Sequence, residues 1–290
     1  MYLVNYEKNG ASEIGVLTQD QQKIVPLPGT MLEFIKAGDE AMARAGELLK
    51  KAETEAKFPF VSLSEVKLLA PIPRPAKNIF CIGKNYREHA LEFDKTSDPN
   101  IAIPKFPVIF TKAVTTVIGP NDEIDSHSDV TSELDYEVEL AVVIGKQGTH
   151  IPKENAMDYV FGFTIINDVT ARDLQKKHNQ WFRGKSLDTF APMGPYLVHK
   201  SSVARPDDLG ISLKVNGELR QNANTGDLIF DIPTLIATIS DGLTLEPGDI
   251  IATGTPAGVA MGFNPPKFLK PGDEMELSIT GLGVLRNKVK

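Results

Sequence analysis

Short runs of alternating hydrophobic and polar residues open the chain, with polar turns at Lys8-Asn9-Gly10 and at 18–21. Alternation with a period of two is typical of half-buried strands, so residues 2–27 are predicted to form a small β-meander. From Thr30 to Leu49 the apolar residues instead recur every three or four positions, which predicts an amphipathic helix.

Prolines then interrupt both patterns, at Pro59, Pro71, Pro73 and Pro75. Proline fits neither a helix interior nor a central strand, so a domain boundary is predicted between residues 57 and 77. We place it after residue 67. This gives a small N-terminal domain over 1–67, a meander plus a helix, and a larger domain over 68–290.

The larger domain is dominated by β-type patterns and has only short helical ones. The predicted strands are Asn78–Ile82, Val108–Phe110, Val138–Ile144, Tyr159–Ile166, Pro195–Val198, Ile211–Val215, Asp249–Thr253 and Glu274–Ile279. The predicted helices are Tyr86–Glu92, Thr170–Asn179 and Ile232–Ser240. The expected fold class is therefore mixed α+β, mostly β, with a few covering helices.

Composition narrows the classes of protein. The 290 residues are 41% hydrophobic and 24% charged, as in an ordinary folded protein. A net charge of −7 argues against nucleic acid as a partner. The single cysteine, Cys81, cannot form an internal disulfide, and no apolar run reaches the length of a membrane helix. We therefore expect a cytoplasmic protein without a membrane partner.

Several common catalytic motifs are absent from the chain. Gly184-Lys185-Ser186 lacks the earlier glycine of a phosphate-binding loop, because Asn179 stands at that position. No Gly-x-Ser-x-Gly elbow and no His-Glu-x-x-His zinc motif occur. Any catalytic chemistry must therefore use another arrangement.

Two carboxylates stand out in the segment that leads into the strand Val138–Ile144. In an extended chain Glu137 and Glu139 point the same way, about 6.6 Å apart. A solvated strand face is the alternative, but the apolar residues on both faces predict a buried strand. Because burying unpaired carboxylates is costly, a divalent metal is the natural counter-charge.

Asp168 is the third candidate ligand, at the end of the apolar run Tyr159–Ile166. Its alternative role is the N-cap of the helix that follows. Thr170 and Asp173 already fit a capping box, which leaves Asp168 free to bind metal. Three carboxylates without Cys or His suit Mg²⁺ or Mn²⁺, with Ca²⁺ as an alternative, and leave coordination positions open for substrate.

Taken in order, five motifs resemble those of the fumarylacetoacetate hydrolase family of metal-dependent enzymes that act on 2-oxo acids. They are Gly83-Lys84-Asn85-Tyr86-Arg87-Glu88-His89, Asp135-Tyr136-Glu137-Val138-Glu139, Asn167-Asp168-Val169-Thr170-Ala171-Arg172-Asp173, Gly184-Lys185-Ser186-Leu187-Asp188-Thr189-Phe190 and Gly254-Thr255-Pro256. The resemblance covers Ile72 to the C-terminus. It implies a mixed β-roll catalytic domain, a homodimer, and Glu137, Glu139 and Asp168 as metal ligands.

The resemblance also implies roles for further residues. Lys185 is expected to be catalytic, Arg172, Gln175 and Thr255 to bind substrate, and His89 with Glu92 to form a mobile acid/base pair. The three-residue spacing of His89 and Glu92 allows contact on one helical turn, where the carboxylate would raise the basicity of the imidazole. Each residue also has a plain alternative: a surface helical pair for His89 and Glu92, a solvated lysine for Lys185, and a turn residue for Thr255.

The reactions expected from this resemblance share a metal-stabilised enolate of a small 2-oxo acid. Oxaloacetate decarboxylation or acylpyruvate hydrolysis is the leading expectation. Isomerisation of a 5-carboxymethyl-2-hydroxymuconate or tautomerisation of oxaloacetate is the alternative. A binding or scaffold protein with vestigial activity is the alternative of another class. Loops at 93–106 and 262–268 are expected to influence substrate specificity.

Overall fold

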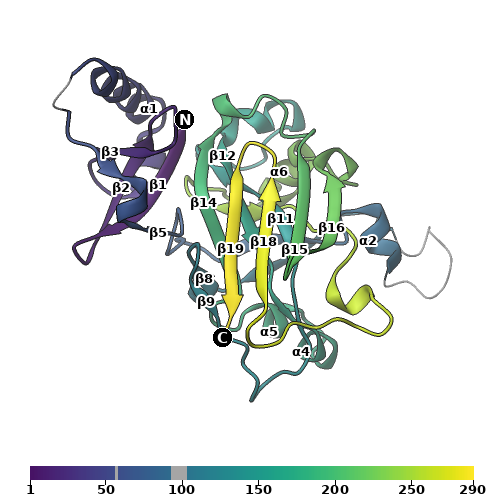
Figure 1. Cartoon of the computed structure of the whole chain (residues 1–290). Helices are drawn as coiled ribbons and strands as arrows, with labels where there is room; N and C mark the ends of the chain where they lie inside the picture. Colours follow the sequence, from purple (N-terminus) through teal and green to yellow (C-terminus); the bar gives the residue numbers. More distant parts are fainter. Residues whose placement is uncertain (56–57, 93–102) are drawn as a thin grey trace.

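The N-terminal part of the chain is a three-stranded meander covered by one long helix (Figure 1). Its strands are β1 (Tyr2–Lys8), β2 (Ala11–Leu17) and β3 (Lys23–Leu27), and the helix is α1 (Met31–Thr54). The structure is a computed structural model that describes residues 1–55, 58–92 and 103–290. The predicted meander and helix are both present, and α1 continues one turn beyond Leu49.

A capping box fixes the start of α1. The backbone N–H of Glu33 donates to Thr30 Oγ1 at 3.3 Å, and that of Thr30 donates to Glu33 Oε2 at 2.8 Å. Two otherwise unpaired backbone donors are satisfied in this way. Within the helix, Gly38 has non-helical dihedral angles (φ 55°, ψ −129°), a left-handed conformation that glycine adopts without steric cost, and the helix kinks there.

The meander is continuous with the sheet that carries the rest of the fold. In the described residues this sheet has 12 strands, and its main path is β4-β3-β2-β1-β14-β12-β11-β17-β6-β7, with β5 paired to β1 and β8 to β14. The remaining bounds are β4 Val61–Ser62, β5 Lys67–Leu69, β6 Ile79–Gly83, β7 Val108–Lys112, β8 Val117–Ile118, β11 Val138–Ile144, β12 Val160–Asn167, β14 Ala191–His199 and β17 Ile250–Ala252.

A second sheet of five strands packs against this one, in the order β16-β15-β18-β19-β9 (Figure 1). Its strands are β9 Glu123–Ile124, β15 Gly210–Val215, β16 Glu218–Asn224, β18 Glu274–Ile279 and β19 Gly283–Val289. A short pair, β10 (Leu134–Asp135) and β13 (Thr170–Ala171), lies apart from both. The fold consists mostly of strands in mixed sheets, in agreement with the predicted class, mixed α+β and mostly β.

Helices are short outside α1. They are α2 Arg87–Glu92, α4 Arg172–Lys177, α5 Phe182–Lys185 and α6 Ile232–Ser240, with 3₁₀ turns η1 Leu63–Glu65, η2 Val114–Thr116, η3 Lys153–Tyr159, η4 Lys200–Ser202, η5 Thr225–Asp227 and η6 Ala260–Gly262. In the described part of the chain, none of the helices combines the length and the apolar character that crossing a membrane requires.

Strand β11 is buried on both faces, as its sequence predicted. Leu140 and Val142 point into the cluster shared with the second sheet, while Ala141 and Val143 join the cluster that contains residues of α1 and β1. The predicted boundary at residue 67 falls inside β5, which pairs with β1 through Asn5 and Leu69. The division into two domains stays a prediction.

One local prediction was wrong. Thr170 does not cap α4: it lies in β13, Ala171 precedes the helix without a side-chain cap, and the Thr170 hydroxyl donates to the carbonyl of Asp168. Asp173 instead accepts from the hydroxyl of Thr131 at 2.6 Å and from the backbone N–H of Ser132. Tertiary contacts with the segment 131–132 therefore replace the local capping box.

Candidate active site

Three carboxylates converge where β11 and β12 lie side by side. Val138 pairs with Asn167 in the antiparallel register. Glu137 and Glu139 stand on either side of Val138, and Asp168 follows Asn167, so the three carboxylates come close together. The backbone N–H of Asp168 donates to the carbonyl of Glu137 at 2.9 Å, which fixes the end of the pair. Single carboxylate oxygens of Glu137, Glu139 and Asp168 all lie within 4.8 Å of one another, and all three residues are buried.

Glu139 is the least compensated of the three. Its Oε2 accepts from the backbone N–H of Gly254 at 2.8 Å, and no cationic side chain in the described residues forms an ion pair with it. Burial, with the nearby charges of Asp168 and Glu137, raises the pKa of Glu139 well above its usual value. Its carboxyl group therefore needs a further positive charge to stay ionised.

Lys185 and Arg172 compensate the charge of Glu137. Lys185 Nζ donates to Glu137 Oε2 and Asp168 Oδ2, each at 2.7 Å, and Arg172 Nη2 donates to Glu137 Oε1 at 2.5 Å. Burial opposes ionisation of Glu137, but these two cations outweigh it and lower its pKa to about 2. Burial likewise opposes the charge of Lys185, yet Asp168 and Glu137 raise its pKa, so Lys185 is held as an ammonium.

The close contact of α4 with α5 brings Lys185 to this position. A Cβ atom at Gly184 would lie 2.6 Å from the backbone nitrogen of Gln175 and 2.7 Å from the carbonyl oxygen of Ala171. Only glycine permits this approach, so Gly184 allows the residue after it to enter the acidic cluster.

Lys112 and Asp135 were not assigned a role from the sequence. Lys112 ends strand β7 and is fully buried; its ammonium donates to Asp168 Oδ1 at 2.6 Å, to the carbonyl of Val169 at 3.0 Å, and to the carbonyl of Lys185. Asp135 accepts from Arg172 Nε at 2.8 Å. A lysine ending an apolar strand was the only available signal for Lys112.

The two residues of the predicted acid/base pair are in contact on helix α2, and their role stays a prediction. His89 Nδ1 lies 3.1 Å from Glu92 Oε2, and both side chains are largely buried. The other Glu92 oxygen accepts from the backbone N–H of Gly258 at 3.0 Å. A Cβ at Gly262 would lie 1.9 Å from Glu92 Oε1, so the loop at 258–262 leaves room for this carboxylate only because it has glycine there.

The loop at 258–262 is also tied to the acidic cluster. The backbone N–H groups of Ala260 and Met261 donate to the Asp135 carboxylate at 2.7 and 3.1 Å. Asp135 also accepts from Arg172, and Arg172 donates to Glu137. A continuous hydrogen-bonded path therefore joins the loop at 258–262 to Glu137, a candidate metal ligand. Asp135 is thus a positioning residue for both parts of the site.

The remaining predicted residues, Gln175 and Thr255, line the same cavity. Gln175 Oε1 accepts from Arg172 Nη1 at 3.1 Å. The Thr255 hydroxyl donates to the carbonyl of Val138 at 2.9 Å and accepts from the side-chain amide of Gln221 at 2.8 Å. Their predicted contacts with substrate stay predictions.

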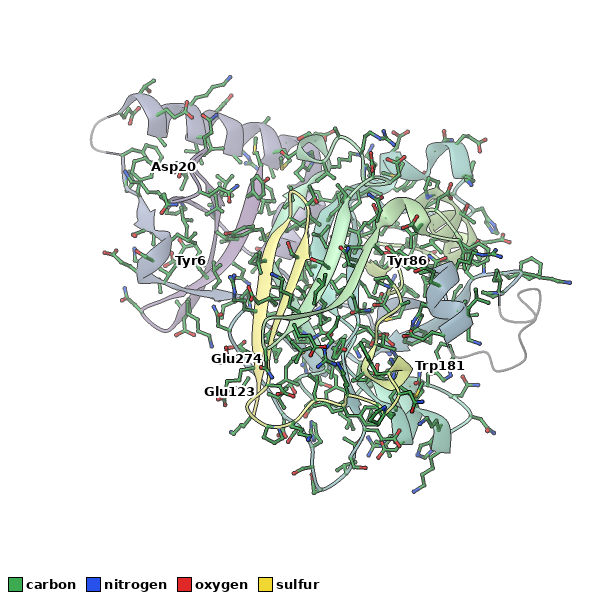
Figure 2. The ribbon with its side chains drawn as sticks, turned by 45° about the vertical axis from the view of Figure 1, so that its right-hand side comes forward. Tyr6, Asp20, Tyr86, Glu123, Trp181 and Glu274 are labelled. Carbon is green, nitrogen blue, oxygen red and sulfur yellow. The ribbon has the colours of Figure 1, made fainter. Side chains whose placement is uncertain are left out.

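The cavity has a volume of about 190 Å³. Seven of the nine predicted site residues line it: His89, Glu137, Glu139, Arg172, Gln175, Lys185 and Thr255. The other two, Glu92 and Asp168, contact lining residues. Trp181 also lines it, and Figure 2 shows Trp181 on the side of the molecule away from the N-terminal Tyr6 and Asp20. Of the predicted specificity loops, residues 93–102 lie outside the described part of the chain.

The donor set fits a divalent cation. Four buried carboxylates, those of Asp135, Glu137, Glu139 and Asp168, lie near three buried basic side chains, Lys112, Arg172 and Lys185. Burial lowers the pKa of Lys112 and raises that of Glu139, so the cluster is short of positive charge. Each carboxylate oxygen has two lone pairs, and one that accepts a hydrogen bond can still bind metal. Hard oxygen donors of this kind favour Mg²⁺, Mn²⁺ or Ca²⁺ over softer metals.

Comparison with known proteins identifies relatives of high similarity. The chain is 57% identical over 266 residues to "Oxaloacetate tautomerase YisK" of Bacillus subtilis (strain 168), covering 91% of this chain and 87% of that protein. It is 46% identical over 265 residues to human "Oxaloacetate tautomerase FAHD2A, mitochondrial", covering 91% and 80%.

Solved structures share the fold over the whole chain. A fumarylacetoacetate hydrolase from Exiguobacterium antarcticum superposes with a TM-score of 0.85 at 42% identity, covering 100% of this chain and 99% of that one. A maleylpyruvate hydrolase from Sphingobium sp. SYK-6, in complex with manganese(II) and pyruvate, has a TM-score of 0.78 at 30% identity, with 100% and 98% covered. Residues 78–290 match the model of the fumarylacetoacetate (FAA) hydrolase C-terminal domain, and the chain therefore belongs to the fumarylacetoacetate hydrolase family.

Proposed function

We propose that this chain is a divalent-metal-dependent enzyme that interconverts the keto and enol forms of oxaloacetate. The observation that carries the proposal is the 57% identity to an oxaloacetate tautomerase, over 91% of this chain, with the acidic cluster Glu137, Glu139 and Asp168 in place. Mg²⁺ or Mn²⁺ is the proposed cofactor. A bound dication would draw electron density from the substrate ketone and acidify the neighbouring C–H bond.

The residues of this chain supply the rest of the chemistry. Tautomerisation removes a proton from the enol oxygen and adds one to C3, or the reverse. Lys185, held as an ammonium, stabilises negative charge on the substrate oxygen and can give or take its proton. His89, which contacts Glu92, lines the same cavity and serves as the acid or base for C3.

The size of the cavity supports a small substrate. Pockets for drug-sized ligands typically measure about 300–1,000 Å³. The volume here is about 190 Å³, which suits an acid of a few carbon atoms. Trp181 and Met261 contribute apolar parts of the cavity wall.

Decarboxylation of oxaloacetate and hydrolysis of an acylpyruvate are competing functions of the same site. One observation supports hydrolysis: His89 and Glu92 form a largely buried contact, and a histidine paired with a carboxylate is suited to act as a base for water. The manganese- and pyruvate-bound maleylpyruvate hydrolase shares the fold. All three reactions pass through an enolate and differ in which bond breaks.

Product analysis separates these reactions. We would add oxaloacetate enriched in its enol form and follow the loss of enol absorbance, with pyruvate measured in parallel by a coupled reduction. The proposal predicts rapid enol decay without pyruvate in the presence of Mg²⁺ or Mn²⁺, and loss of catalysis in Glu137→Gln. Stoichiometric pyruvate would show decarboxylation instead, and pyruvate released from acetylpyruvate would show hydrolysis.

Two further predictions accompany the proposal. A cytoplasmic location is proposed because Cys81 is free and buried, as suits a reducing compartment. A homodimer is proposed from the family resemblance, and light scattering of the purified protein measures it. A scaffold function without catalysis would be supported if none of the three reactions were detected with either metal.

A further inference from the structure

The cations that line the cavity differ in how they are neutralised. Lys185 contacts Glu137 and Asp168, and Arg172 contacts Asp135 and Glu137. Lys176 pairs with Glu133 at 2.8 Å near the surface. Lys84 also lines the cavity, but it forms no ion pair with any acidic side chain in the described ranges.

The backbone on both sides of Lys84 is fixed. Gly83, at the end of β6, packs under the ring of Trp181, since a Cβ there would lie 2.3 Å from a ring carbon. The buried Asn85 side chain donates to the carbonyl of Thr253 at 2.7 Å and accepts from the N–H of Phe230 at 2.8 Å. The backbone position of Lys84 is therefore set by its two neighbours, and Lys84 itself is half-buried.

The conformation of Lys84 is itself unusual. Its φ is +54°, in the left-handed region that non-glycine residues rarely occupy. Such a conformation persists only where the surroundings determine it, and it is often found next to binding sites. Here the packing of Gly83 and the hydrogen bonds of Asn85 fix the backbone on both sides of Lys84, which lines the cavity.

A dicarboxylate needs a cation at this wall. When the 2-oxo acid end of oxaloacetate points to the acidic cluster, its second carboxylate lies elsewhere in a small and partly apolar cavity. A carboxylate buried without a partner costs several kcal/mol. The other lining cations already have carboxylate partners, which leaves Lys84 to supply the charge.

We infer that Lys84 binds the second carboxylate of the substrate and so selects dicarboxylic over monocarboxylic 2-oxo acids. The inference rests on the proposed function, in that oxaloacetate is the substrate considered. It extends that function by naming the residue that distinguishes oxaloacetate from a monocarboxylic 2-oxo acid of equal length. Lys84 is a specificity-determining residue in this assignment, and the proton transfers remain with Lys185 and His89.

The test compares oxaloacetate with 2-oxobutanoate, in which a methyl group replaces the second carboxylate. Binding of each is measured by calorimetry with Mn²⁺ for the wild type, Lys84→Met and Lys84→Arg. Lys84→Met is expected to weaken the binding of oxaloacetate by about 10- to 100-fold, the range for a lost charge-assisted hydrogen bond, and to leave the affinity for 2-oxobutanoate unchanged. Lys84→Arg is expected to retain most of the wild-type preference for oxaloacetate over 2-oxobutanoate.

Two controls keep the outcome interpretable. Oxalate lacks a distant carboxylate, so its unchanged affinity for Lys84→Met would show that the variant is folded and its metal site intact. Lys176→Met removes a neighbouring lysine that has its own partner, and the ratio of the two affinities should not change. Equal weakening of oxaloacetate and 2-oxobutanoate by Lys84→Met, or no weakening of either, would overturn the assignment.

The readout is binding, so it separates this inference from the proposed reaction. If the wild type binds oxaloacetate in a Lys84-dependent way but does not tautomerise it, the proposed function fails and the assignment of Lys84 stands. If tautomerisation is fast and the wild type binds both acids equally, the assignment fails alone.

Discussion

At the scale of single residues, the site is dominated by an imbalance of buried charge. Asp168 and Glu137 have cationic partners for both of their oxygens, whereas Glu139 has none in the described residues. Glu139 is therefore the carboxylate whose burial costs the most free energy, and the one that a bound metal ion would stabilise most. Two residue-scale predictions follow from the partners of these groups.

Glu139 should make the metal-free protein less stable as the pH rises. Its folded-state pKa is raised, so the folded protein binds a proton more tightly than the unfolded chain does. The stabilisation is complete below the ordinary glutamate pKa of about 4.3 and is lost as the pH rises toward the folded-state value. Urea denaturation at a series of pH values should show this slope for wild type in a chelator.

Glu139→Gln should flatten that slope and also weaken metal binding, because the amide neither titrates nor carries a charge. Added Mn²⁺ should raise the melting temperature of wild type more at higher pH, where less work is needed to remove the Glu139 proton. An identical pH dependence in Glu139→Gln and wild type would assign the effect to another group.

Lys112→Met should destabilise the protein by about 3–5 kcal/mol, the typical cost of removing one partner of a buried ion pair. The change takes a donor from Asp168 and from the carbonyls of Val169 and Lys185. Equilibrium denaturation measures the loss. As a control, Lys67→Met breaks a partly exposed pair with Asp122 and should cost less than about 1 kcal/mol.

At the scale of elements, short loops and helices hold the reactive groups against a rigid sheet. The register of strands β11 and β12 fixes the three carboxylates. Helix α2 contributes His89, helix α5 contributes Lys185, and the loop at 258–262 holds Glu92 by a hydrogen bond. Glycines at element ends allow the close approaches. The geometry of the site therefore depends on glycine positions, where the lack of a side chain leaves room for the neighbouring segment.

Gly262→Ala should impair catalysis with little loss of stability. The new Cβ would fall 1.9 Å from Glu92 Oε1, the end of a flexible side chain that can move away. Glu92 would then leave the N–H of Gly258 and no longer orient His89. We expect a fall in kcat of about 10-fold or more, within the usual contribution of general acid–base catalysis, with oxalate affinity unchanged.

A matched control for this change is Gly46→Ala, which adds a methyl group within helix α1, far along the chain from the site. It should leave kcat unaltered. If Gly262→Ala kept full activity, the placement of Glu92 against the loop at 258–262 would have no catalytic role.

At the scale of the whole molecule, the N-terminal part shares its core with the catalytic part. Leu3 and Ile35 belong to the same buried cluster as Ala141, Val143 and Ala252. β1 also pairs with β14 through Tyr2 and Leu3. A shared core and a shared sheet should make the chain unfold as one cooperative unit.

Phe34→Ala tests this expectation. Phe34 on α1 packs edge-to-face on Phe161 of β12, with ring centroids 6.4 Å apart. Its truncation should cost about 3–5 kcal/mol and lower a single melting transition, seen identically by far-ultraviolet dichroism and by loss of oxalate binding. Glu47→Ala, on the exposed face of the same helix, should have little effect. Two separate transitions, with only one shifted, would show independent domains.

Local pattern predicted most of the elements because it reflects local physics. The alternation in β1 and β2, the apolar spacing of α1 and the strand Val138–Ile144 are all encoded within a few residues. The failed capping box at Thr170 shows the limit of such reasoning: Asp173 had a better partner in Thr131, forty-two positions earlier in the chain. A motif cannot report a competing contact from a distant segment.

The sequence by itself determined which chemistry was available: three acidic side chains, a lysine, and a histidine and glutamate one turn apart. Only the tertiary structure decided how their charges are balanced. Lys112 and Asp135 owe their importance to where β7 and β10 lie beside the acidic cluster, and Lys84 to where the end of β6 meets the cavity. The cost of a buried charge depends on the distance to every other charge, and those distances exist only once the strands have paired.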